Sequence, residues 1–203
     1  MTKLILAGLL CVAPGFAEQA LSVGVLGGAP FTDVVTATNQ NYLAFLPKST
    51  NFTIGPAVQV NLPASFRVEV DALYRPYSFS ATSTVPAPFA TSIAPINVSA
   101  MQWRFPVLAQ YRFMKDSRFS PFVSGGLSFD HLSNISAAAQ RITSGTGQLV
   151  KQSNAGVVLG GGMDVKIPLF RVSAELRYTH QGSADFAALS NVNQAELLVG
   201  VHF

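Results

Sequence analysis

The chain has 203 residues and a formal net charge of +3, and only 11% of its residues are charged, whereas soluble domains average about 25%. This small, dispersed charge argues against a nucleic-acid-binding protein. No stretch of about 18 apolar residues occurs, which excludes a membrane-spanning helix. An apolar chain without a long apolar run is expected when only half of each strand faces lipid, as in a transmembrane β-barrel.

The N-terminus has the features of a cleaved secretory signal. Lys3 precedes an apolar run over residues 4–13 and then small residues that suit a cleavage site. We expect residues 1–17 to be removed and residues 18–203 to form one domain. The single cysteine, Cys11, lies in the expected signal, so the mature domain would need no disulfide in an oxidising compartment.

Eight segments alternate apolar and non-apolar residues with the two-residue period of a β-strand. In chain order they cover residues 21–25, 53–62, 66–75, 102–113, 123–130, 156–167, 170–179 and 194–203. No charged residue falls on any of the eight apolar faces. The pattern therefore predicts eight strands, each with one apolar face.

The connections between these segments alternate in length. The long ones cover residues 32–50, 76–97, 131–152 and 181–192, and the tight ones cover 63–65, 114–120 and 168–169. Transmembrane barrels carry short turns at one end and long loops at the other, whereas a soluble sheet has no such requirement. We therefore expect an all-β fold, an eight-stranded antiparallel up-and-down transmembrane β-barrel with both termini at the short-turn end.

Aromatic residues recur near both ends of the apolar faces. Those near the short turns are Phe66, Phe113, Phe170 and Phe203, and those near the long loops are Tyr74, Trp103, Phe129 and Tyr178. The eight residues from Phe66 to Tyr74 span roughly 20 Å along the membrane normal, at a rise of about 3.3 Å and a tilt of about 40°. The apolar band of such barrels is about 25 Å tall, so the spacing predicts two aromatic girdles.

Three phrases carry a resemblance to a known family: residues 121–127 (PFVSGGL), 160–165 (GGGMDV) and 175–178 (ELRY). They resemble the middle and late strands of eight-stranded outer-membrane barrels of the protein A and protein X type. The resemblance implies a bacterial outer-membrane location with both termini periplasmic, and a terminal strand ending at Phe203 that the barrel-assembly machinery recognises. It also implies contact with outer-membrane lipids and lipopolysaccharide, and we expect a monomer.

The inward positions of the expected strands carry most of the charge. The predicted lumen network consists of Arg67, Glu69, Asp71, Arg75, Arg104, Arg112, Asp164, Arg171, Glu175, Arg177 and Glu196. Eight strands leave an interior that side chains can fill, and buried charges must pair, so we expect a paired, filled interior. A narrow ion pathway is the alternative. The glycines at 160–162 lack the strand–turn–helix context of a phosphate loop, and no cofactor or metal is expected.

The segment His131-Leu132-Ser133-Asn134 matches the His-x-Ser-Asn motif of lipid A 3-O-deacylase barrels, a weak local similarity. The strand period places His131 and Ser133 outward, as a base and nucleophile acting on a lipid would require. That family carries the motif on its penultimate strand, with a glutamate downstream, and this chain has neither feature. We therefore expect a non-enzymatic barrel with a structural and surface-display role. A lipid A-modifying hydrolase and a small low-conductance channel are the alternatives.

Overall fold

The computed structural model describes residues 20–33, 37–40, 43–48, 52–83, 96–114, 116–136, 149, 151–185 and 190–203. The expected signal at residues 1–17 lies outside the described residues, as do parts of the long loops. Among the described residues, no helix is long and apolar enough to cross a bilayer.

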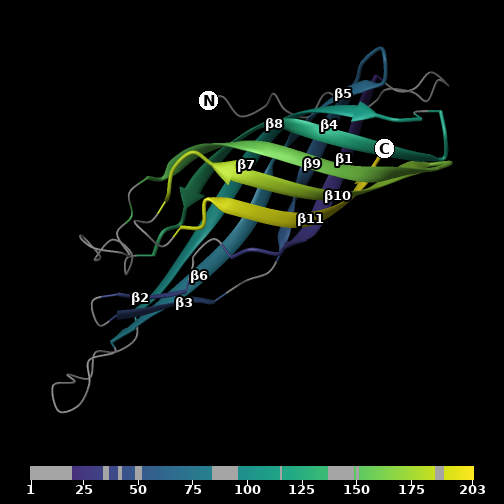
Figure 1. The fold of residues 1–203 in the computed structure, drawn as a ribbon. Coiled ribbons are helices and arrows are strands. Elements are labelled where there is room, and N and C mark those ends of the chain that lie inside the picture. Colours follow the sequence, from purple (N-terminus) through teal and green to yellow (C-terminus); the bar gives the residue numbers. More distant parts are fainter. Residues whose placement is uncertain are drawn as a thin grey trace, which may run out of the picture.

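Eight antiparallel strands close into a barrel (Figure 1). They are β1 (Leu21–Pro30), β4 (Thr53–Asn61), β5 (Phe66–Asp71) together with β6 (Leu73–Ser83), β7 (Ile96–Arg112), β8 (Phe119–Ser133), β9 (Ser153–Ile167), β10 (Phe170–Gln181) and β11 (Asn193–His202). β1 pairs with β4 on one side and with β11 on the other, which closes the ring. The prediction of an eight-stranded antiparallel barrel is confirmed.

β5 and β6 form one barrel strand that is interrupted at Ala72. The register with β4 and with β7 is the same on both sides of this residue. That register places Pro56 of β4 and Pro106 of β7 beside the interruption, and a proline has no N–H to donate to a neighbouring strand. The two prolines explain the gap in pairing, although Ala72 still donates its N–H to the carbonyl oxygen of Pro56 at 3.0 Å.

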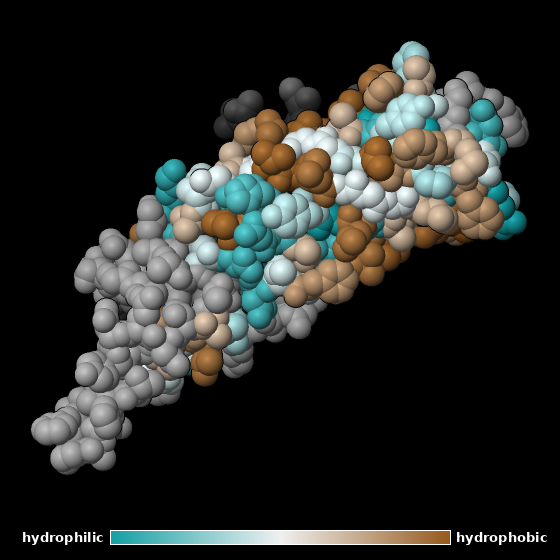
Figure 2. Space-filling view, in the orientation of Figure 1, coloured by the Kyte–Doolittle hydropathy of each residue, from teal (hydrophilic) through white to brown (hydrophobic). Residues whose placement is uncertain are grey.

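The alternation of the barrel wall follows the predicted faces. Outward apolar side chains such as Val25, Leu127, Leu159, Leu176 and Val199 are exposed. The inward neighbours of these residues are mostly buried and polar. Figure 2 shows hydrophobic side chains along the barrel wall.

The long-loop end differs from the prediction. Residues 32–50, expected to be a loop, contain the hairpin β2 (Thr38–Gln40) and β3 (Leu43–Lys48), and β3 pairs with β6. β6 and β7 also extend well beyond the predicted strand ends. The alternation of apolar and polar residues continues in these extensions, but here the apolar face points inward. The prediction required an outward apolar face and therefore did not include them.

We call this extension the lobe: β2, β3, residues 76–83 of β6 and residues 96–101 of β7. Figure 1 shows it projecting from the long-loop end at the lower left. Leu132 of β8 completes its buried hydrophobic core. The other members are Phe45, Tyr77, Phe79, Ala81, Val98 and Ala100. Its outward positions on β6 and β7 are largely polar, among them Ser78, Ser80, Thr82, Asn97 and Ser99.

Candidate functional site

The barrel interior is the largest concentration of ionisable side chains among the described residues. The strands place five buried arginines there, at 67, 75, 104, 112 and 177. Six buried strand carboxylates accompany them: Glu69, Asp71, Asp130, Asp164, Glu175 and Glu196. The half-buried Arg171 adds a sixth guanidinium, so these strand arginines and carboxylates balance. All eleven residues of the predicted network lie on the inward face.

Arg177 is the centre of this interior. Its guanidinium lies 3.0 Å from a carboxylate oxygen of Glu69, 2.9 Å from Asp71 and 2.7 Å from Glu175. These three carboxylates come from β5 and β10, and Ser124 of β8 donates its hydroxyl to Glu175 at 2.6 Å. The network therefore links β5, β8 and β10 through one fully buried cation.

A glycine makes room for this centre. A Cβ atom at Gly160 would lie 2.5 Å from Oε1 of Glu175 and 2.4 Å from Oγ of Ser124. Both distances are too short for a carbon against an oxygen, so a larger residue at 160 would displace the Glu175 carboxylate. Gly160 thus serves packing of the interior rather than a phosphate loop.

A second group of contacts lies nearer the short turns. Arg67 donates to Asp164 at 2.7 Å and to the side-chain oxygen of Gln110 at 2.6 Å. The same Asp164 oxygen lies 3.6 Å from Nε of Arg171. Gln59 donates to Glu69 and accepts from Arg171, so it connects this group to the Arg177 centre.

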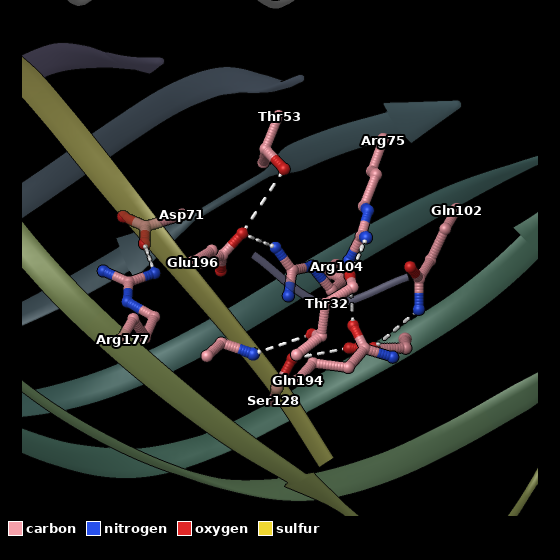
Figure 3. A network of polar contacts seen from close by, with 12 residues as sticks. Thr32, Thr53, Asp71, Arg75, Gln102, Arg104, Ser128, Arg177, Gln194 and Glu196 are labelled. Carbon is pink, nitrogen blue, oxygen red and sulfur yellow. Dashed lines mark hydrogen bonds and ion pairs between the residues drawn. The ribbon is translucent and has the colours of Figure 1, made fainter. Parts of the chain in front are cut away.

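A third group lies toward the long loops (Figure 3). Arg104 donates to Glu196 at 2.5 Å, and Thr53 donates to the same carboxylate oxygen at 3.3 Å. Arg75 donates to the backbone oxygen of Thr32 at 2.7 Å and to Gln194 at 3.1 Å. These contacts connect side chains from β4, β6, β7 and β11 near the long-loop end of the lumen.

Neutral polar residues complete the network, and they are not among the network residues predicted from the sequence. Asp130 accepts from Ser128 at 2.5 Å, from Gln102 at 3.0 Å and from Gln181 at 2.5 Å. The other glutamine and threonine partners are Gln59, Gln110, Gln194 and Thr53. Their inward position in the alternation was the available signal, because a buried amide on a charged face needs a partner.

All eight predicted girdle aromatics lie on the outer wall, and several touch one another. Tyr74 and Trp103 have ring centroids 5.4 Å apart near the long loops, and Phe170 and Phe203 lie 6.2 Å apart near the short turns. The other four predicted positions are Phe66, Phe113, Phe129 and Tyr178. Further outer aromatics at the same two levels, not included in the prediction, are Phe31, Phe52, Tyr111 and Phe119.

The structure does not bring His131 and Ser133 together. Nδ1 of the exposed His131 lies 2.9 Å from the hydroxyl of Ser153, which is its partner across the β8–β9 pair. Ser133 instead directs its hydroxyl to the backbone oxygen of Met101 at 3.5 Å. Among the contacts of the described residues, no carboxylate is bonded to either side chain, so the base has no orienting acid.

Comparison with known proteins places this geometry in a family. The family model for the outer membrane protein beta-barrel domain matches residues 3–203. No curated protein has a significantly similar sequence.

The chain is also similar to solved structures of other barrels. Neisserial surface protein A is 17% identical, with 90% of this chain and 94% of that chain covered and a TM-score of 0.55. The N-terminal β-barrel domain of OprF from Pseudomonas aeruginosa is 14% identical, with 90% and 96% covered and a TM-score of 0.49. At these identities the likeness concerns the fold alone. Because the family model covers nearly the whole chain, this protein belongs to the outer membrane β-barrel family and is a bacterial outer-membrane protein.

Proposed function

We propose that this protein is a non-enzymatic barrel that holds a folded lobe outside the cell, with its interior filled and both termini in the periplasm. The observation that carries the proposal is the inversion of polarity along β6 and β7. Within the barrel these strands turn Tyr74 and Phe105 outward, whereas in the lobe they turn Ser80 and Ser99 outward. An outward polar face suits water, and an outward apolar face suits lipid.

The aromatic girdle supports the same division. Tyr74 and Trp103 lie where the apolar outer wall ends and the lobe begins. Aromatic rings favour the membrane–water interface because they combine an apolar body with a polar edge. The lobe would therefore stand above the bilayer on the long-loop side, which in this family of folds is the external side.

The burial of the charged side chains in the lumen favours a structural role over a conducting one. Side chains of Arg67, Arg112 and Arg177 are at most 1% exposed. A water-lined path would leave such charged groups in contact with solvent. The contacts of Arg177 instead connect facing strands of the wall, which favours an interior that stabilises the barrel.

The side chains on the outer wall do not favour the alternative function of a lipid A hydrolase. A serine nucleophile needs a base within hydrogen-bond reach and a third group that orients the base. The pairing of His131 with Ser153, rather than with Ser133, leaves the sequence motif without its expected geometry. Mass spectrometry of lipid A from cells that overproduce the protein tests this directly, and we expect no lost acyl chain.

Labelling of intact cells tests the display of the lobe. A cysteine introduced as Ser80→Cys should react with a membrane-impermeant maleimide, because Ser80 is on the outward face of the lobe. The matched variant Ala64→Cys, in the tight turn after β4, should react only after the outer membrane is permeabilised. The only natural cysteine, Cys11, lies in the expected signal. Labelling of Ala64→Cys but not Ser80→Cys on intact cells would reverse the proposed orientation.

A further inference from the structure

We propose that the long-loop end of the lumen carries a calcium site, formed by the carboxylates of Asp130 and Asp185 and the side-chain amide oxygens of Gln102 and Gln181. The site adjoins the apolar core of the lobe, because Leu132, the next inward residue after Asp130 on β8, belongs to that core. It does not depend on which end of the barrel faces the cell exterior.

Asn154 brings the two carboxylates together. It is the direct partner of Asp130 across the β8–β9 pair, and side chains at such positions have Cβ atoms about 5 Å apart. The Asn154 side chain also forms a hydrogen bond with the carboxylate of Asp185, and Asp130 lies close enough to repel that carboxylate. The hydroxyl of Ser183 donates to Oδ1 of Asn154 at 2.8 Å, which holds the start of the β10–β11 loop against β9. Two acidic side chains from β8 and this loop are therefore neighbours.

Neither carboxylate has a cationic partner of its own. Among the described residues, no ion pair includes Asp130 or Asp185. Arg104 attracts Asp130, but its guanidinium is bonded to Glu196. Lys151 is exposed, and it contacts Asp185 through its backbone N–H. Because Asp130 and Asp185 are at most 6% exposed, their charges need compensation, and a bound cation would supply it.

Two amide oxygens beside Asp130 lack hydrogen-bond partners. Nε2 of Gln102 and Nε2 of Gln181 donate to the same oxygen of Asp130, at 3.0 Å and 2.5 Å. Both glutamines are at most 4% exposed, and Oε1 of each is buried without a partner among the described residues. An unpaired buried oxygen is unfavourable. A half-turn of each amide would direct both oxygens toward a cation at Asp130, which would satisfy them.

The chemistry of these ligands favours calcium. Ca²⁺ accepts carboxylate and amide oxygens in a flexible shell of about six to eight, whereas Mg²⁺ requires a near-ideal octahedron and retains several waters. A buried set of oxygens from β7, β8, β10 and a loop suits the more adaptable ion. No cluster of three or more His, Cys, Asp or Glu side chains suited to a metal occurs in the described part of the chain. With only two carboxylates, we expect a Kd of about 0.1–1 mM.

Isothermal titration calorimetry tests the site on the full chain, refolded in a neutral detergent and freed of metal with a chelator. At pH 7 we expect Ca²⁺ to bind roughly tenfold more tightly than Mg²⁺. Asp185→Asn removes one charged ligand at constant size and should weaken Ca²⁺ binding at least roughly tenfold. Gln102→Met removes an amide oxygen from a side chain of similar length and should weaken it by a smaller factor.

Hydrogen exchange gives a second measurement that locates the ion. Ca²⁺ should slow exchange in residues 181–185 of the natural chain, because the ion would join Asp185 to β8. Exchange near the β7–β8 turn, at residues 116–118, should not change. Protection at the turn without protection at residues 181–185 would place the ion elsewhere and overturn the proposal.

The control variant is Asp116→Asn, which removes an exposed carboxylate from the short-turn end and should leave Ca²⁺ binding unchanged. No binding by the natural chain up to about 10 mM Ca²⁺, well above the expected Kd, would overturn the proposal. Unaltered binding by Asp185→Asn, or an equal loss in Asp116→Asn, would do the same. If Asp185→Asn does not refold, the natural chain still decides, because equal affinities for Ca²⁺ and Mg²⁺ would contradict a calcium site.

Discussion

The barrel wall and the lobe are built by the same two strands, β6 and β7, yet their polarities are opposite. In the barrel, these strands turn Arg75 and Arg104 inward and leave apolar residues outside. A few residues further along, they turn Phe79 and Val98 inward and leave serines outside. The backbone alternation does not change between the two regions. The solvent outside each region, lipid or water, therefore decides which face is apolar.

The two interiors are consequently held together by different forces. The barrel interior relies on ion pairs and hydrogen bonds, in which each buried charge must find a partner. The lobe core relies on apolar burial, which stabilises by roughly 25 cal/mol per Å² and does not depend on direction. Changes that remove a charge should damage the first region, and changes that remove apolar volume should damage the second.

The largest effect is expected from Arg177→Met. It leaves Glu69, Asp71 and Glu175 without the cation that they share. Breaking a buried ion pair by removing one partner costs about 3–5 kcal/mol, and urea unfolding in lipid vesicles would measure the loss. Adding Asp71→Asn and Glu175→Gln to the same chain should restore part of it. A variant as stable as the natural chain would show that the ion pairs do not hold the barrel.

Phe79→Ala should affect the lobe and leave the barrel folded. The ring is 1% exposed, in contact with Phe45 at a centroid distance of 6.3 Å. Truncating a buried phenylalanine costs about 3–5 kcal/mol. We expect this loss to lower the free energy of local unfolding of the lobe. Hydrogen exchange in residues 73–83 should accelerate while the urea midpoint of the barrel stays the same. The control Ser80→Ala, on the outward face, should change neither quantity. An equal loss of barrel stability would mean that the two regions unfold together.

The same charge on the same strand should be costly in one region and tolerated in the other. Val70→Arg places a cation on the lipid-facing wall, at a cost of about 2–4 kcal/mol near the bilayer midplane. Ser80→Arg, on the same side of the sheet within the lobe, should change stability by less than about 0.5 kcal/mol. Refolding titrations of the two variants give the comparison. Equal costs would place the lobe in lipid and refute the inversion.

The smallest effect is expected from pH at the mouth of the barrel. Burial, together with the nearby Asp130, raises the pKa of Asp185 in the β10–β11 loop from 3.8 to about 6. A raised folded-state pKa means that the docked loop binds this proton more readily than an undocked one. Docking is therefore favoured at low pH and weakens as the pH rises through about 6. Between pH 5 and pH 7 we expect a change of about 1 kcal/mol.

Hydrogen exchange of the loop, corrected for its intrinsic pH dependence, measures this change. Asp185→Asn should remove the pH dependence and keep the loop docked at pH 7. A pH dependence that survives in Asp185→Asn would show that another group causes the effect.

The sequence predicted the barrel strands correctly but missed the strands of the lobe. The alternation identified all eight barrel strands and the outward side of Phe66, Tyr74 and Trp103, because side-chain direction in a strand follows from backbone geometry. The same rule failed for the lobe. The prediction required an apolar face on the outside, and the residues after Tyr74 satisfy the alternation only with the apolar face inside.

The partners of the inward charges depended on the closed barrel. Arg67 and its partner Asp164 are separated by 97 positions in the chain, and Arg177 and Asp71 by 106. Which of them meet depends on the strand register and the diameter of the ring, and no local pattern encodes either. The contact of His131 with Ser153 also depends on register, because the β8–β9 pairing places Ser153 directly beside the histidine.

The sequence by itself determined the strand count and which side chains face in or out, because a two-residue period is a local property of extended backbone. Only the tertiary structure decided the lobe and the pairing of charges across the lumen. Those features join residues that are distant in the chain, and their positions follow from closure of the sheet into a ring of fixed register.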